Sequence, residues 1–201
     1  QEQVLKALEP IWKTKTETAT RLRGRIESVL DWATARKYRS GENPARWKGH
    51  LDKLLPAPGK IKKVEHQRAL PFNEIAGFMD ELKSHQGIAA RALEFTILCA
   101  ARSGEVRGAT WSEIDMEKAV WTIPSQRMKA GKEHRVPLSG AAIKILESLP
   151  RHTDSNLVFP GTKGRPLSDM SLLAVLRRMK VNAVTHGFRS SFRDWVSEAT
   201  N

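Results

Sequence analysis

Apolar side chains recur every three or four residues in several parts of this chain, which is the spacing of one face of a helix. In residues 16–37 such a face is formed by Ala19, Leu22, Ile26, Leu30 and Ala33. Arginines crowd the other faces of this segment, so it predicts a basic amphipathic helix. Residues 43–56 offer a cap at Asn43, a first-position proline at Pro44 and a stop at Pro56, and these predict a second, short helix.

Helical periodicity is lost after Pro56, in a stretch that gathers prolines, a glycine and several lysines. This composition is typical of a surface linker. We therefore predict a small helical domain over residues 1–57, a linker over 58–68 and a second domain over 69–201.

The second domain is predicted to be a mostly helical body with a small sheet on one side. Helices are predicted over residues 70–84, 87–101, 140–149 and 168–180, and a last one begins near Thr185. The helix over 87–101 is apolar on most faces, so we expect it at the centre of the core. Between residues 108 and 139, β-branched and aromatic residues surround two turns. They predict a three-stranded antiparallel sheet whose second hairpin has a long loop over 125–133.

The chain is strongly basic. Its 34 Lys and Arg residues against 22 Asp and Glu give a net charge of +12 and an isoelectric point near 10.1. A polyanion is therefore the first partner to consider, with nucleic acid ahead of an anionic membrane surface. The longest strongly apolar stretch, residues 95–101, is far too short to span a bilayer, and no signal-peptide pattern is visible. We expect a cytoplasmic protein.

Cysteine and histidine usage suggests neither a disulfide nor a metal site. The single cysteine, Cys99, lies in the apolar stretch, so we expect a buried small hydrophobe rather than a nucleophile. The six histidines lack the paired spacing of a structural zinc site, so no metal and no cofactor is predicted. Trp111, Trp121 and Trp195 sit within apolar patterns and are expected to be core or packing residues rather than base-stacking platforms.

Two short pairs suggest a phosphate site. Arg102 and Glu105 are three residues apart at the predicted end of the apolar helix, where the carboxylate can orient the guanidinium as a phosphate clamp. His186 and Arg189 repeat this spacing at the start of the last helix, whose amino-terminal end attracts anions. A surface ion pair is the simpler interpretation of either pair alone.

The long hairpin loop carries a third candidate. Lys129 can neutralise a phosphate or protonate a leaving alkoxide. Lys132 competes for the same role from the same loop, and spacing alone does not choose between them. His134 lies at the end of this loop. Its side chain either approaches the phosphate site or makes its hydrogen bonds to the backbone.

Three segments in order carry a family resemblance: "ARSGEVRGATWSEID" (101–115), "RMKAGKEHRVPLS" (127–139) and "THGFRSSFRDWVSE" (185–198). They resemble the catalytic domain of the phage-type tyrosine recombinases, the integrases of phages and genomic islands. Residues 18–56 are similar to the end of the core-binding domain of that family. The resemblance implies a site-specific recombinase with the tyrosine-recombinase catalytic fold.

The resemblance also implies a role for each candidate. Arg102 and Arg189 hold the scissile phosphate, and Glu105 supports that site. Lys129, rather than Lys132, is the general acid toward the 5′ oxygen, and His186 assists proton transfer at the nucleophile. The nucleophile of the family is a tyrosine that forms a 3′-phosphotyrosyl bond without ATP or metal.

The only tyrosine of this chain departs from that pattern. Tyr38 lies in the helical domain, and we expect it to contact the DNA backbone or an interface rather than to attack phosphate. The family's tyrosine is expected some tens of residues beyond the "HGFR" segment, so we expect a truncated integrase that binds DNA without cleaving it. More helix is also expected before residue 18.

The expected partner is double-stranded DNA, enclosed by cationic faces of both domains. The predicted DNA contacts are Arg21, Arg25, Lys60, Lys62 and Lys63. We expect a monomer in solution and a tetramer on DNA only for a full-length parent. The alternative is a non-catalytic DNA-binding regulator or accessory protein with the same fold.

Overall fold

The computed structural model describes residues 1–61, 67–151, 153 and 155–200. The chain divides into two compact units, Gln1–His66 and Gln67–Asn201. The dividing point falls inside the segment 58–68. The first four residues of that segment are ordered as a short helix, α3 (Pro58–Ile61), where the sequence predicts only a linker.

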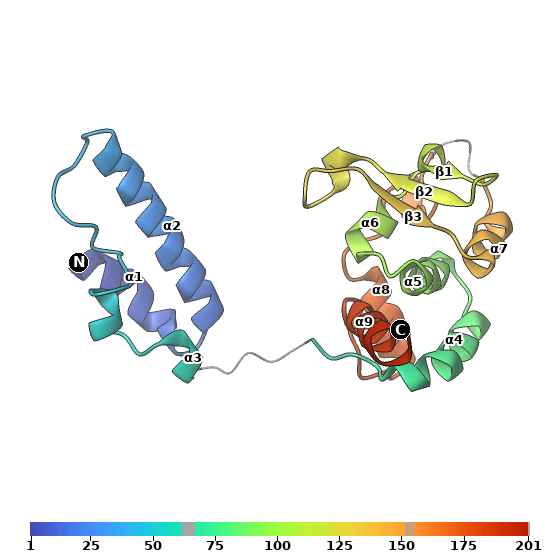
Figure 1. The fold of residues 1–201 in the computed structure, drawn as a ribbon, viewed down its shortest axis with the longest axis horizontal. Coiled ribbons are helices and arrows are strands. Elements are labelled where there is room, and N and C mark those ends of the chain that lie inside the picture. Colours follow the sequence, from blue (N-terminus) through green and yellow to red (C-terminus); the bar gives the residue numbers. More distant parts are fainter. Residues whose placement is uncertain (62–66, 152, 154, 201) are drawn as a thin grey trace. The chain divides into compact units, whose positions relative to one another are not determined.

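The first unit is built on two helices that pack against each other, α1 (Glu2–Trp12) and α2 (Thr16–Ala35) (Figure 1). Helix α2 matches the predicted helix, whereas α1 is not predicted. Its buried side chains are spaced four residues apart: Val4, Leu8 and Trp12. That spacing was the available signal, and it places an apolar stripe against α2.

The short helix predicted over residues 43–56 is wrong. This segment forms turns and a three-residue 3-10 helix, Leu51–Lys53. Gly49 has a φ of +78°, which interrupts helical geometry. The Asn43 side chain donates to Glu27 O at 2.8 Å and to Asp31 Oδ1 at 2.7 Å, so it ties the segment to α2. Tertiary hydrogen bonds thus replace the predicted helix.

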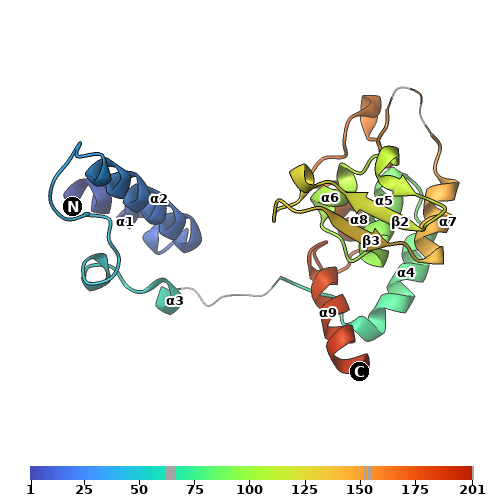
Figure 2. The same ribbon diagram turned by 45° about the horizontal axis from the view of Figure 1, so that its top comes forward.

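The second unit has a three-stranded antiparallel sheet in the order β1-β2-β3, as predicted. The strands are β1 (Ile114–Asp115), β2 (Val120–Ile123) and β3 (His134–Pro137). Trp121 pairs with Ile114 on one side and Val136 on the other, and its ring is fully buried. The sheet lies along one side of the helical body (Figure 2).

Helix α5 (Ile88–Leu98) is central to this unit, as its apolar sequence predicts. It contacts four other helices: α4 (Ile75–Ser84), α6 (Ser103–Arg107), α7 (Gly140–Ser148) and α8 (Ser171–Arg178). A last helix, α9 (Gly187–Ala199), packs against the 3-10 turn Phe72–Glu74. The described residues of this unit also form 3-10 turns at Trp111–Glu113, Ser125–Arg127 and Thr162–Gly164. The fold class is mainly α with a small sheet, as predicted.

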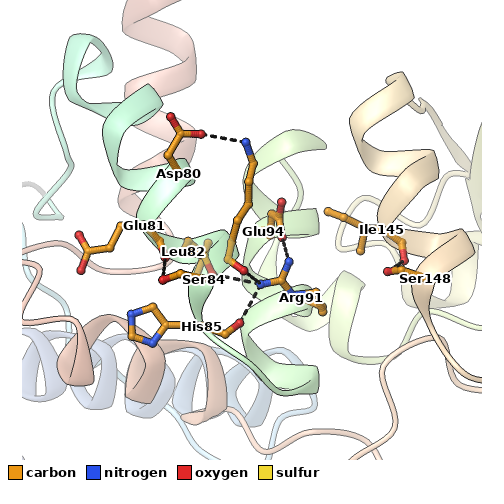
Figure 3. Close-up of polar contacts among 10 residues, drawn as sticks. Asp80, Glu81, Leu82, Ser84, His85, Arg91, Glu94, Ile145 and Ser148 are labelled. Carbon is orange, nitrogen blue, oxygen red and sulfur yellow. Dashed lines mark hydrogen bonds and ion pairs between the residues drawn. The ribbon is translucent and has the colours of Figure 1, made fainter.

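A half-buried arginine joins α4 to α5 (Figure 3). Arg91 donates to three carbonyls at the end of α4, those of Leu82 at 3.1 Å, Lys83 at 3.0 Å and His85 at 2.8 Å. Its other nitrogen donates to the buried Glu94 carboxylate at 2.6 Å. Carbonyls at a helix end lack partners within the helix, so Arg91 satisfies several of them at once. No local sequence pattern marks Arg91 for this role.

Candidate phosphate-binding site

Arg102 and Glu105 lie at the start of α6, not at the end of the apolar helix. Helix α5 ends at Leu98, and Arg102 is the residue that precedes α6. The Glu105 carboxylate accepts a hydrogen bond from the Arg102 backbone nitrogen at 2.8 Å and from Arg102 Nη1 at 2.7 Å. Glu105 is buried, whereas 43% of the Arg102 side chain is exposed. The carboxylate therefore holds the guanidinium at the surface, where an anion can reach it.

The turn between α5 and α6 passes through Ala100, which has a φ of +44°. This left-handed conformation costs a residue with a Cβ atom about 1 kcal/mol. Here the turn presents the carbonyl of Ala100 to Arg189 Nη1, which donates a hydrogen bond to it. Arg189 is thus hydrogen-bonded to the residue that lies two positions before Arg102 in the chain.

Helix α9 positions His186 and Arg189. His186 is exposed just before the helix, and Arg189 is half-buried in its first turn. Between them, Gly187 lies so close to the chain at Arg68 that an added Cβ would be 2.1 Å from the Arg68 carbonyl oxygen. Only glycine fits at this approach. Gly187 was not among the predicted site residues, and its place between His186 and Arg189 is the sequence signal that could have identified it.

A surface pocket of about 620 Å³ joins α9 to the sheet and to the turn after α5. It is lined by Leu98, Cys99, Ala100, His134, Arg135, Val136, Pro137, His186, Arg189, Ser190, Phe192 and Arg193. The residues that line it include three arginines and two histidines and no carboxylate, so the pocket favours an anion. His134 lies with His186 and Arg189, whereas Arg102, Glu105 and Lys129 do not line this pocket.

Lys129 and Lys132 are both exposed on the hairpin loop between β2 and β3. Neither makes a hydrogen bond or ion pair with the part of the chain that the structure describes. The assignment of Lys129 over Lys132 therefore stays a prediction. The loop is anchored by Arg127, which donates to the Glu113 carboxylate and to the carbonyl of Glu105. Sequence reasoning missed Arg127 and Glu113.

Cys99 is half-buried and lines the pocket, so its side chain is less buried than predicted. Burial raises the pKa of its thiol to about 12. The thiol is therefore protonated at neutral pH and a poor nucleophile. Of the three tryptophans expected to be core or packing residues, Trp121 is buried, Trp111 is half-buried and Trp195 is 43% exposed, with its ring 5.8 Å from that of Phe192.

In the first unit, a basic face runs along α2. Arg21 is exposed and pairs with Glu17 at 2.8 Å, and Arg25 is exposed one turn further on. A shallow depression of about 550 Å³ lies over this face, lined by Arg21, Gly24, Arg25, Ser28 and Val29. Such a surface can follow a phosphate backbone. Lys60 is exposed on α3, and Lys62 and Lys63 lie outside the described residues.

Tyr38 follows the end of α2 and is 73% exposed. Its ring lies 5.6 Å from that of Trp32, and the Arg36 guanidinium lies 5.8 Å from the Trp32 ring centre. This exposed cluster of two aromatic rings and one cation belongs to the first unit. The cluster is typical of a contact surface. The Tyr38 hydroxyl is not set up as a nucleophile, because no described residue that could act as a base is hydrogen-bonded to it.

Two kinds of feature are not found among the described residues. No group of three His, Cys, Asp or Glu side chains is arranged to hold a metal ion. No described helix is long and apolar enough to cross a membrane.

The fold matches solved integrases. A lambda integrase dimer bound to a COC′ core site aligns with a TM-score of 0.71 and 15% identity, over all of this chain and 71% of that one. The Tn1549 transposon integrase in complex with transposon right end DNA aligns with a TM-score of 0.73 and 12% identity, over all of this chain and 73% of that one. At these identities the likeness establishes the shared fold.

Sequence relatives agree with the fold. The prophage integrase IntZ of Escherichia coli (strain K12) is 32% identical over 98% of this chain and 48% of its own length. The integrase of Enterobacteria phage P4 is 29% identical over 92% of this chain and 45% of its own length. The chain thus spans about half the length of these curated relatives. Residues 1–50 match the phage integrase central domain, and residues 68–200 match the phage integrase family. The chain belongs to the phage integrase family.

Proposed function

We propose that this chain is the DNA-binding and phosphate-holding part of a site-specific recombinase. The observation that carries the proposal is the junction of α5, α6 and α9. There Arg189 is held by the Ala100 carbonyl, and Arg102 is held two residues later by the Glu105 carboxylate. Two separately anchored guanidinium groups beside a cationic pocket suit a phosphodiester. Family membership supports the same conclusion.

The proposed reaction is phosphoryl transfer between DNA strands. A tyrosine oxygen attacks the phosphorus, and the bond from phosphorus to the 5′ oxygen breaks. Lys129 donates a proton to the departing 5′ oxygen, and His186 assists the proton transfer at the nucleophile. Arg102 and Arg189 stabilise the charge that gathers on the phosphate oxygens in the transition state. The phosphotyrosyl ester conserves the bond energy needed for rejoining.

We propose that the nucleophile of this reaction is not among residues 1–201. Tyr38 is the only tyrosine, and it packs on Trp32 in the first unit. Residues 1–201 should therefore bind duplex DNA without forming a covalent adduct. A phosphotyrosyl adduct formed by these 201 residues would contradict this part of the proposal.

Both units are proposed to contact the duplex mainly through phosphates. In the first unit the contacts are Arg21 and Arg25 on α2, with Lys60 and the lysines Lys62 and Lys63 that follow. In the second unit they are the cationic pocket and the hairpin loop. We propose that this chain is a monomer in solution. A tetramer on DNA is proposed only for a longer parent protein.

Salt-dependent binding tests the proposal. We expect the affinity for a fluorescein-labelled mixed-sequence duplex, measured by anisotropy, to fall by about 10³-fold or more between 50 and 200 mM salt if six or more phosphates are contacted. The double substitution Arg21→Ala with Arg25→Ala should weaken binding and make its salt dependence shallower. Affinity that does not change with salt would refute the phosphate contacts.

A non-catalytic DNA-binding regulator with the same fold is the competing function. Arg102→Ala and Arg189→Ala, made in a longer chain that contains the family's tyrosine, separate the two. A recombinase loses most strand cleavage and keeps much of its DNA affinity. Absence of cleavage by the unsubstituted longer chain would favour the regulator.

A further inference from the structure

Arg127 lies where the hairpin loop meets α6, and its contacts connect two parts of the proposed site. It ends the 3-10 turn Ser125–Arg127 and precedes Lys129 by two residues. Its Nη2 donates to the backbone carbonyl of Glu105, the residue whose carboxylate holds Arg102. Figure 1 shows α6 beside the end of the sheet from which this loop projects.

The carbonyl of Glu105 needs a partner from outside its helix. Its usual donor would be the backbone nitrogen of Ala109, but that nitrogen donates to the carbonyl of Val106 at 3.0 Å. Arg127 therefore satisfies a carbonyl in the last turn of α6, at the end that favours a cation. The fit is close, since a Cβ added at Gly108 would be 3.2 Å from Arg127 Nη2.

Glu113 holds Arg127 in this position. Both carboxylate oxygens accept from Arg127 Nη1, and one of them also accepts from Trp121 Nε1 at 2.9 Å. Only 10% of the Glu113 side chain and 24% of the Arg127 side chain are exposed. With its charge paired and its donors directed inward, Arg127 is placed to support the structure rather than to meet a ligand.

We infer that Arg127, held by Glu113, is a positioning residue that sets where Lys129 stands relative to Arg102. Lys129 makes no hydrogen bond or ion pair with the described part of the chain, so the contacts of Arg127, two residues earlier, are what hold this part of the loop in place. The inference rests on the proposed function, in which Lys129 contacts the phosphate that Arg102 binds. Arg127 acts through Lys129 and is not itself a catalytic residue.

The decisive variant is Glu113→Gln, because a positioning role for Glu113 and a simple effect of net charge predict opposite changes in DNA affinity. Removing a carboxylate from a DNA-binding protein should tighten binding if only net charge matters. If Glu113 holds the Lys129 loop in place, the same change should weaken binding. Glutamine keeps an oxygen that can accept from Trp121 Nε1, so the core contact is preserved. Glu117→Gln is the matched control, since Glu117 is exposed on the turn at the opposite end of the sheet.

The measurement is the salt dependence of affinity for a labelled mixed-sequence duplex, using the whole 201-residue chain. Lys129→Ala should lower the slope of log K against log salt by about 1 and the affinity by roughly five- to tenfold near 0.1 M salt. Glu113→Gln should produce a loss of the same kind in the parent chain and no further loss in the Lys129→Ala background. Partial unfolding would reduce the active fraction at every salt concentration without changing this slope.

Each outcome has a definite meaning. Unchanged or tighter binding by Glu113→Gln, or an equal loss with and without Lys129, overturns the positioning role. If Lys129→Ala itself leaves the slope unchanged, the proposed phosphate contact of Lys129 fails, and the inference fails with it. Arg127→Met provides a second variant, and an additional loss in the Lys129→Ala background would mean that Arg127 contacts DNA directly.

Discussion

Glu105→Ala is the substitution for which the structure makes the sharpest energetic prediction. The buried carboxylate accepts two hydrogen bonds from Arg102, one from the backbone nitrogen and one from the guanidinium. Loss of the first removes a helix cap, which costs about 1 kcal/mol. Loss of the second costs about 1 to 2 kcal/mol, a value reduced because 43% of the Arg102 side chain is exposed. We expect the second unit to lose about 2 to 3 kcal/mol of unfolding free energy.

The single cysteine makes an assay specific to this unit possible. Cys99 is half-buried in the native state, and its raised pKa keeps the thiol protonated. Labelling with a thiol reagent across a urea series therefore reports unfolding of the second unit, without a signal from the first. The expected loss shifts the urea midpoint down by about 1 M.

Two further variants sharpen this test. Glu105→Gln keeps an acceptor for the Arg102 backbone nitrogen and should cost about half as much as Glu105→Ala. Glu147→Ala is the matched control, because Glu147 is exposed on α7, and its effect should stay within about 0.5 kcal/mol. A Glu105→Ala effect no larger than that of the control would refute the view that this carboxylate organises the turn.

Other predictions follow from the same contacts. Arg91→Ala leaves Glu94 buried without its partner, so we expect a loss of about 3 to 5 kcal/mol in the same urea assay, and a loss below 1 kcal/mol would contradict this. Hydrogen bonds from Lys118 and its charge lower the pKa of Asp115 from 3.8, so the stability that this carboxylate contributes is present above pH 3.8 and is lost as the pH falls through the lower folded value. Asp115→Asn should therefore be less stable than the parent chain at neutral pH and equally stable in acid. A difference in melting temperature that stays constant from neutral to acid pH would argue against this linkage. Because burial raises the pKa of Cys99 to about 12, its labelling in the native protein should remain slow at pH 9, and a rate like that of a free thiol in stopped-flow kinetics would show that the thiolate is accessible.

The local pattern of the sequence determined much of this protein. Periodicity predicted α2, the central α5, the later helices and the three-stranded sheet, because each depends on which residues within a few positions are apolar. Charge indicated a polyanionic partner, and the order of three motifs carried the resemblance to the phage integrase family that the comparisons confirm. The roles of Arg102, Lys129, His186 and Arg189 stay predictions.

Only the tertiary structure decided how the site is held together. Arg189 bonds to a backbone carbonyl 89 residues away in the chain, and Arg127 bonds to one 22 residues away. Every residue carries a carbonyl, so no sequence pattern marks the one that will be left unpaired at a turn or helix end. The helix predicted over residues 43–56 does not form for a similar reason, because the Asn43 side chain makes hydrogen bonds to α2 that the sequence pattern does not show. Local spacing specifies elements, whereas the partners of backbone polar groups are settled only when those elements pack.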